Sequence, residues 1–168
     1  LDKYAKAIAA LRVGNGIEEH VEIGPLMHDR AIAKCEQHVA DARAKGARVL
    51  TGGKKMGGLF YAPTLLADVT SDMQIYREET FGPVAPVMAF DHEDDVVQQA
   101  NDSEYGLAAY LLTNDHDRAA RVSNALEYGM VAINEGILSS EVAPFGGVKE
   151  SGFGREGGLH GLRAYLDL

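Results

Sequence analysis

The sequence LAAYLLTNDHDRAARVSNALEYGMVAIN occupies residues 107–134 and decides the fold class. Its two ends, 107–113 and 130–134, are apolar along nearly their whole length, which is typical of strands covered on both faces. Residues 115–127 between them follow the apolar spacing of a helix that ends at Gly129. A strand, a helix and a second strand in this order predict an α/β sheet.

The same alternation runs through the earlier part of the chain. Helical spacing predicts a helix over 30–45 that is capped by Asp29, and a helix over 92–101 that is capped by Asp91. Further strands are predicted at 48–51, 60–69 and 84–90. We therefore expect an α/β fold built on a mostly parallel sheet with helices on both faces.

Composition is typical of a globular domain and restricts the partners. Apolar residues make up 46% and charged residues 24%, as expected for a folded globular protein. The net charge of −9 disfavours binding to nucleic acid or to an anionic membrane surface. A single cysteine excludes an internal disulfide and suits a reducing compartment, so we expect a cytoplasmic protein with neither nucleic-acid nor membrane partners.

Both ends of the chain predict that it belongs to a longer polypeptide. It begins at Leu1 without a methionine, already in a helical pattern that places Tyr4, Ile8 and Leu11 on one face. At the other end, residues 163–168 include what reads as the start of a strand. We therefore expect a segment cut from a larger protein.

The first candidate site is Glu-Glu-Thr-Phe-Gly-Pro at residues 78–83. The Gly82-Pro83 pair predicts a turn that fixes the geometry of Phe81. A carboxylate two residues from a fixed aromatic ring can accept hydrogen bonds from sugar hydroxyls while the ring packs against a heterocycle. The other interpretation is a solvated turn with no ligand.

A second candidate is the segment 133–143, which follows a predicted buried strand. Ligand crevices of open α/β sheets form where such strands end. Ser139 and Ser140 can hydrogen-bond the polar end of a substrate there, although most surface serines have no such role.

The glycine-rich stretch 144–158 contains a match to the dinucleotide motif G-x-G-x-x-G at residues 152–157. That motif needs a buried strand before it and an acidic residue about 20 positions after it. Neither is present in this sequence, which favours a loop packed against its neighbours over a phosphate-binding loop.

Nucleophile and metal chemistry find little support in this sequence. Cys35 lies on the apolar face of the helix predicted over 30–45, so it is interpreted as a core residue rather than a nucleophile. The histidines show no i,i+3 or i,i+4 pairs and no cysteine partners, and we therefore expect no metal site.

Three motifs together resemble the C-terminal third of an aldehyde dehydrogenase, in family order and spacing, over essentially the whole chain. They are Glu-Glu-Thr-Phe-Gly-Pro at 78–83, Ala-Asn-Asp-Ser-Glu-Tyr-Gly-Leu-Ala-Ala at 100–109 and Pro-Phe-Gly-Gly-Val-Lys-Glu-Ser-Gly at 144–152. Within the family, the segments 14–16, 133–143 and 151–157 are most similar to succinate-semialdehyde dehydrogenases.

The resemblance implies roles for four residues and a cofactor. Glu79 matches the glutamate that holds the nicotinamide ribose, and Phe81 matches the aromatic residue beside the nicotinamide. Ser139 matches a serine that helps hold the distal carboxylate of the substrate, and Phe145 matches an aromatic wall near the reacting carbonyl. The cofactor is expected to be NAD or NADP, and the substrate a small aldehyde.

The resemblance also implies which parts lie outside this sequence. The nucleophilic cysteine, the general-base glutamate and the Rossmann-like cofactor domain would precede residue 1, so no catalytic residue is expected within the chain. The isolated chain, as part of a catalytic domain, is then expected to be inactive. The parent is expected to form a homodimer or homotetramer, with 163–168 starting a truncated oligomerisation strand.

Two alternatives to a succinate-semialdehyde dehydrogenase remain open. One is another aldehyde or semialdehyde dehydrogenase of the family, such as one for glutarate semialdehyde, since Ser139 alone is thin support for a carboxylate. The other is a non-catalytic binding or assembly module that retains the fold.

Overall fold

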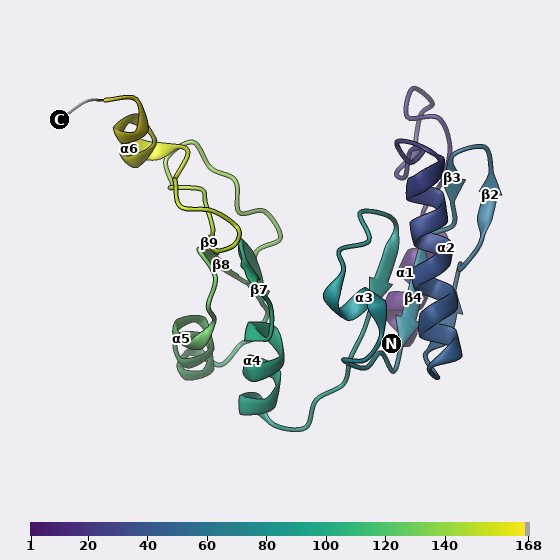
Figure 1. Ribbon diagram of the computed structural model, residues 1–168, viewed down its shortest axis with the longest axis horizontal. Helices are drawn as coiled ribbons and strands as arrows, with labels where there is room; N and C mark the ends of the chain where they lie inside the picture. Colours follow the sequence, from purple (N-terminus) through teal and green to yellow (C-terminus); the bar gives the residue numbers. More distant parts are fainter. Residues whose placement is uncertain (167–168) are drawn as a thin grey trace. The chain divides into compact units, whose positions relative to one another are not determined.

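The structure is a computed structural model that describes residues 1–166 (Figure 1). The chain divides into two compact units, Leu1–Ala89 and Phe90–Leu168. Among the described residues, no helix is both long enough and apolar enough to cross a membrane.

The first unit is organised around a small mixed sheet. Its elements are α1 (Asp2–Ala10), α2 (Asp29–Ala44), β1 (Arg48–Thr51), β2 (Lys55–Gly57), β3 (Phe60–Tyr61), β4 (Thr64–Ala67), α3 (Gln74–Arg77) and β5 (Val84–Pro86). The strand order is β1–β4–β5, with β1 antiparallel and β5 parallel to β4. Strands β2 and β3 form a separate antiparallel hairpin.

The core of the first unit lies between α2 and the sheet. Figure 1 shows α2 in front of β4 and the fainter α1 behind it, so helices cover both faces here. The apolar face of α2 is buried, as its spacing predicts. The core cluster consists of Ile32, Cys35, Val39, Ala42, Ala47, Tyr61, Leu66, Val69, Met73, Ile75 and Val84.

The second unit contains the strand–helix–strand predicted from residues 107–134. Its elements are α4 (Glu93–Asn101), β6 (Tyr105–Gly106), β7 (Ala108–Leu111), α5 (His116–Ala125), β8 (Met130–Ile133), β9 (Val148–Lys149), α6 (Gly158–Gly161) and a 3-10 helix, η1 (Leu162–Tyr165). Strands β7 and β8 pair in parallel, from Ala108 opposite Met130 to Leu111 opposite Ile133. The α5 crossover between them begins at Asp115, whose carboxylate accepts a hydrogen bond from the Arg118 amide.

The α/β fold is confirmed, but the strand pairing is more mixed than expected. The β4–β5 and β7–β8 pairs are parallel, whereas β1–β4, β2–β3 and β6–β9 are antiparallel. A parallel pair needs a long crossover. The two residues between β2 and β3 allow only a hairpin.

Both predicted helix caps are corrected by one residue. His28 caps α2, because its Nδ1 accepts a hydrogen bond from the Ala31 amide at 3.0 Å, and Asp29 lies in the first turn instead. Helix α4 follows His92 without a side-chain cap, rather than following Asp91. In both helices the acidic residues of the first turn still complement the positive end of the helix dipole.

The strand expected to start within 163–168 is not formed where the structure describes that segment. Residues Leu162–Tyr165 are a 3-10 helix that continues directly from α6, because local hydrogen bonds satisfy the backbone there. Residues 167–168 lie outside the described part of the chain.

Candidate functional site

The loop 78–83 connects α3 to β5 in the first unit. Phe81 has a φ of 53°, in the left-handed region that bulky side chains rarely occupy, and the residue is 82% exposed. Neither the strained backbone nor the exposed ring is favourable by itself. Their combination makes Phe81 a candidate for contact with a ligand.

Helix α2 holds the backbone of this loop. Lys34 donates a hydrogen bond from Nζ to the Glu79 carbonyl oxygen at 2.5 Å. Gly82 approaches the helix so closely that a Cβ there would lie 2.4 Å from Cys35 Sγ. The loop is therefore anchored through its backbone, while the side chains of Glu79 and Phe81 remain exposed.

Glu79 and Phe81 line the same open hollow, which has a volume of about 450 Å³. Val84 and Ile75 contribute apolar surface to the hollow. A carboxylate can accept hydrogen bonds from two neighbouring hydroxyls, and an aromatic ring can pack against a flat heterocycle. The hollow thus brings together the two side chains for which the sequence predicted contact with a sugar and a heterocycle, and that contact stays a prediction.

Cys35 has the surroundings of a core thiol rather than a nucleophile. Its side chain is fully buried, and this burial is the main reason that the pKa of the thiol is raised. A nucleophilic cysteine needs the opposite shift and access to substrate. Within residues 1–166, no group of three His, Cys, Asp or Glu side chains is placed to hold a metal ion.

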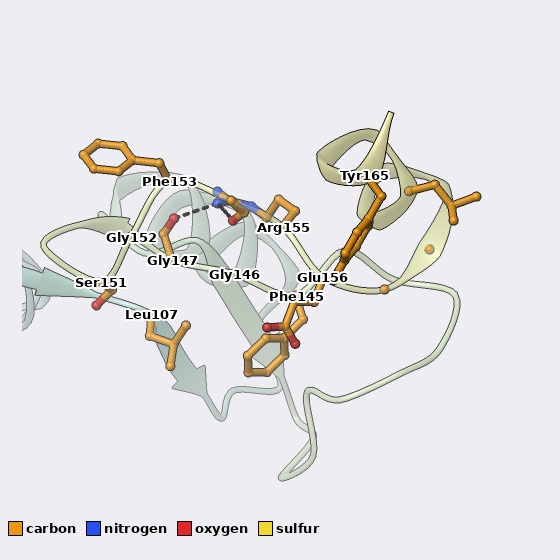
Figure 2. Close-up of a pocket in the computed structure, with 15 residues that line it drawn as sticks. Leu107, Phe145, Gly146, Gly147, Ser151, Gly152, Phe153, Arg155, Glu156 and Tyr165 are labelled. Carbon is orange, nitrogen blue, oxygen red and sulfur yellow. Dashed lines mark hydrogen bonds between the residues drawn. The ribbon is translucent and has the colours of Figure 1, made fainter. Parts of the chain in front are cut away.

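In the second unit, Phe145 is held by a short bridge between two distant parts of the glycine-rich stretch. The amide of Phe145 donates to the Glu156 carbonyl at 2.7 Å, and the amide of Glu156 donates back to the Phe145 carbonyl at 2.7 Å. Phe145 lines a cavity of about 660 Å³ (Figure 2). Leu107 and Tyr165 line the same cavity, so much of its wall is apolar.

The glycine-rich loop packs against its own backbone, as its context in the sequence predicted. The guanidinium of Arg155 donates from Nη1 to the carbonyls of Gly147 and Gly154, at 2.7 and 2.8 Å (Figure 2). A Cβ on Gly146 would lie 2.4 Å from the Gly154 carbonyl oxygen, which requires glycine there. Two carbonyls satisfied by an arginine do not form a cradle for an anion, which needs converging amide donors.

Ser139 lies apart from the cavity that Phe145 lines. It is exposed, in the irregular segment that follows β8, and it is not among the residues around that cavity. The structure therefore brings Glu79 and Phe81 together in one hollow, but it does not bring Ser139 and Phe145 together in one cavity.

Comparison with known proteins decides the family. The sequence model of the "Aldehyde dehydrogenase family" matches residues 1–168 of this chain. The chain belongs to the aldehyde dehydrogenase family.

Similar family members include enzymes named for semialdehydes. The NADP(+) succinate-semialdehyde dehydrogenase GabD of Escherichia coli (strain K12) is 52% identical over 169 residues, covering 99% of this chain and 35% of that protein. A glutarate-semialdehyde dehydrogenase of Pseudomonas putida is 50% identical over 167 residues, with 99% and 35% covered. The chain thus spans about a third of the length of these curated relatives.

Solved structures of the family share this fold. The crystal structure of an aldehyde dehydrogenase from Brucella melitensis biovar abortus 2308 matches with a TM-score of 0.97 and 55% identity. The match covers 99% of this chain and 34% of that chain.

Sequence reasoning missed the residues of α2 that support the candidate site. Lys34 and His38 lie one helical turn apart, and both contact the loop 78–83. The available signal was a histidine at helical spacing from Cys35 and Ala42 on a face that is otherwise apolar. Metal-binding spacing, the pattern that most often singles out a histidine, is absent at this position.

Proposed function

We propose that this chain is the C-terminal part of the catalytic domain of an NAD(P)-dependent dehydrogenase that oxidises succinate semialdehyde to succinate. The observation that carries the proposal is the hollow in which Glu79 and Phe81 lie together, in a chain of this family. The names of its semialdehyde-oxidising relatives support the substrate class. The name of the Escherichia coli relative includes NADP(+), which supports a nicotinamide coenzyme.

Each residue then has a defined role. The Glu79 carboxylate accepts hydrogen bonds from the ribose hydroxyls, and the exposed ring of Phe81 packs at the nicotinamide end of the coenzyme. The bound coenzyme would accept a hydride from the substrate carbon. Phe145 forms part of an apolar wall for the aldehyde, and Ser139 donates a hydrogen bond to its distal carboxylate. The nucleophile and the general base would be supplied by the N-terminal remainder of the same enzyme.

A glutarate-semialdehyde dehydrogenase is the second candidate. The Pseudomonas putida relative named for that activity is about as similar as the succinate-semialdehyde relative. The two substrates differ by one methylene group, which changes binding in an apolar pocket by only about 1–3 kcal/mol. The parent is proposed to be a cytoplasmic homodimer or homotetramer in either case.

Replacing Glu79 tests the coenzyme assignment. In the full-length enzyme, Glu79→Ala should raise the dissociation constant for NAD(P) about tenfold or more, because hydrogen bonds to a charged acceptor contribute about 1.5–3 kcal/mol. Coenzyme binding is measured by protein fluorescence, and KM for the aldehyde at saturating coenzyme should change little. Glu36→Gln, an exposed glutamate of α2, is the control and should leave both values unchanged. Unchanged coenzyme binding in Glu79→Ala would contradict the assignment.

Replacing Ser139 tests the carboxylate assignment. Ser139→Ala should raise KM for succinate semialdehyde, because a hydrogen bond to the charged carboxylate contributes up to about 1.5–3 kcal/mol of binding free energy. The KM for a neutral aldehyde of similar length should rise much less. Ser140→Ala is the matched control, since the Ser140 hydroxyl accepts a hydrogen bond from the Val142 amide within its own loop. Equal effects of Ser139→Ala on both aldehydes would rule out the carboxylate contact.

A further inference from the structure

His38 is a fully buried polar side chain that faces the loop 78–83 from α2. Its Nδ1 lies 2.9 Å from the hydroxyl oxygen of Thr80, which is itself buried. Its Nε2 lies 3.5 Å from a carboxylate oxygen of Glu78 and has no hydrogen bond within the described residues. One imidazole ring thus contacts the residues on either side of Glu79.

These two contacts determine which ring nitrogen carries the proton. If Nε2 carried a lone pair, it would face the Glu78 carboxylate oxygen, and two hydrogen-bond acceptors would repel each other. An N–H group at Nε2 is instead attracted to that oxygen. With a proton on Nε2, Nδ1 accepts the hydrogen of the Thr80 hydroxyl. Both contacts are then favourable.

The same contacts determine the direction in which Glu79 points. Glu78 has extended backbone, with φ −110° and ψ 124°, and successive side chains of extended backbone alternate in direction. Because Glu78 and Thr80 both turn toward His38, the Glu79 side chain between them is directed away from α2. Lys34 fixes the same residue from the helix side through its carbonyl oxygen.

We propose that His38 is a positioning residue for coenzyme binding, acting on the carboxylate of Glu79 and the ring of Phe81 through Thr80 and Glu78. The inference rests on the proposed function of Glu79 and Phe81. A buried hydrogen bond that holds the loop in its binding conformation lowers the entropic cost of ordering it when coenzyme binds. Without that bond the loop samples other conformations, and coenzyme binding weakens even though every residue that touches the coenzyme is present.

The test uses the full-length enzyme and a substitution that preserves shape. Thr80→Val removes the hydroxyl and leaves Nδ1 of His38 unpaired, and we expect the dissociation constant for NAD(P) to rise about tenfold. KM for the aldehyde at saturating coenzyme should stay within about twofold, since the loop does not hold the aldehyde. His38→Leu should weaken coenzyme binding at least as much, since it also removes the Nε2 contact with Glu78. The double variant should be no worse than His38→Leu, because Thr80→Val removes a bond that His38→Leu has already removed. In His38→Asn, the amide oxygen can take the place of Nδ1 as the acceptor for Thr80, so this variant should keep most of the coenzyme binding that His38→Leu loses.

A matched control separates positioning from stability. Thr64 is also a buried threonine, but its hydroxyl bonds the Gly53 amide and the Ala62 carbonyl rather than the loop. Thr64→Val should lower the unfolding temperature and leave coenzyme binding unchanged.

Two outcomes overturn separate claims. If Thr80→Val and His38→Leu lower only the unfolding temperature while Glu79→Ala still weakens coenzyme binding, His38 is merely structural and the proposed function stands. If Glu79→Ala leaves coenzyme binding unchanged, the proposed function of that residue fails, and the positioning role fails with it.

Discussion

Replacing Gly129 with alanine should destabilise the protein by about 3 kcal/mol, at the upper end for an overpacked site. A Cβ at this position would lie 2.1 Å from the Gly146 carbonyl oxygen and 2.8 Å from Gly147 Cα. These neighbours are backbone atoms, so no side-chain rotation can relieve the clash. The turn before β8 and the loop that carries Phe145 would have to separate, and the unfolding temperature, measured by calorimetry, should fall by several degrees.

Gly136→Ala is the matched control for this substitution. Nothing lies within 4 Å of a Cβ at Gly136, and its backbone is not in the left-handed region. We expect its unfolding temperature to equal that of the unchanged protein or to exceed it slightly, because alanine reduces the freedom of the unfolded chain. Equal unfolding temperatures for the two variants would show that the close approach at Gly129 is not a constraint on the fold.

Replacing Lys149 with methionine should lower the free energy of unfolding by about 2–3 kcal/mol. Methionine keeps most of the aliphatic side chain but removes the hydrogen bonds of the ammonium group. The Lys149 ammonium donates to the carbonyls of Asn101 and Ser103 at 3.0 and 3.1 Å, and it lies 2.6 Å from a carboxylate oxygen of Glu127. These contacts connect the end of α4 to β9, which are nearly fifty residues apart in the sequence. The loss is measured as a lower midpoint of urea unfolding.

Glu127→Gln distinguishes the two kinds of contact that Lys149 makes. The Glu127 side chain is 58% exposed, and an exposed ion pair contributes only about 0–1 kcal/mol. The Glu127→Gln variant should therefore be nearly as stable as the unchanged protein. If Glu127→Gln were as unstable as Lys149→Met, the stabilisation would come from the ion pair rather than from the two hydrogen bonds to carbonyl groups.

Much of the fold could be predicted because its signals are local. The strands β7 and β8 and the helix α5 between them follow from continuous apolar runs and helical spacing within residues 107–134. The buried face of α2 follows from spacing alone in the same way. The 3-10 helix at Leu162–Tyr165 overlaps the segment 163–168 that was expected to start a strand, and a few apolar residues do not distinguish the two.

The parts that could not be predicted depend on contacts between distant residues. Strands β6 and β9 are two residues long and pair across more than forty positions, so neither shows a periodic pattern. The candidate site shows the same limit: motif resemblance singles out Glu79 and Phe81, but their support from His38 through Thr80 crosses 42 positions. A histidine on an apolar face shows only that some partner is needed, and the fold decides which residue it is.

The loop 78–83 and Phe145 are held by different hydrogen bonds. Those that fix Glu79 and Phe81 come from α2, within residues 1–89, and those that fix Phe145 come from residues within 90–166. None of the residues that make the backbone bonds at Phe145 is among those that bond the loop 78–83. Under the proposed function, substitutions around Phe145 can therefore be screened for aldehyde preference while Lys34, His38 and Thr80 are kept unchanged.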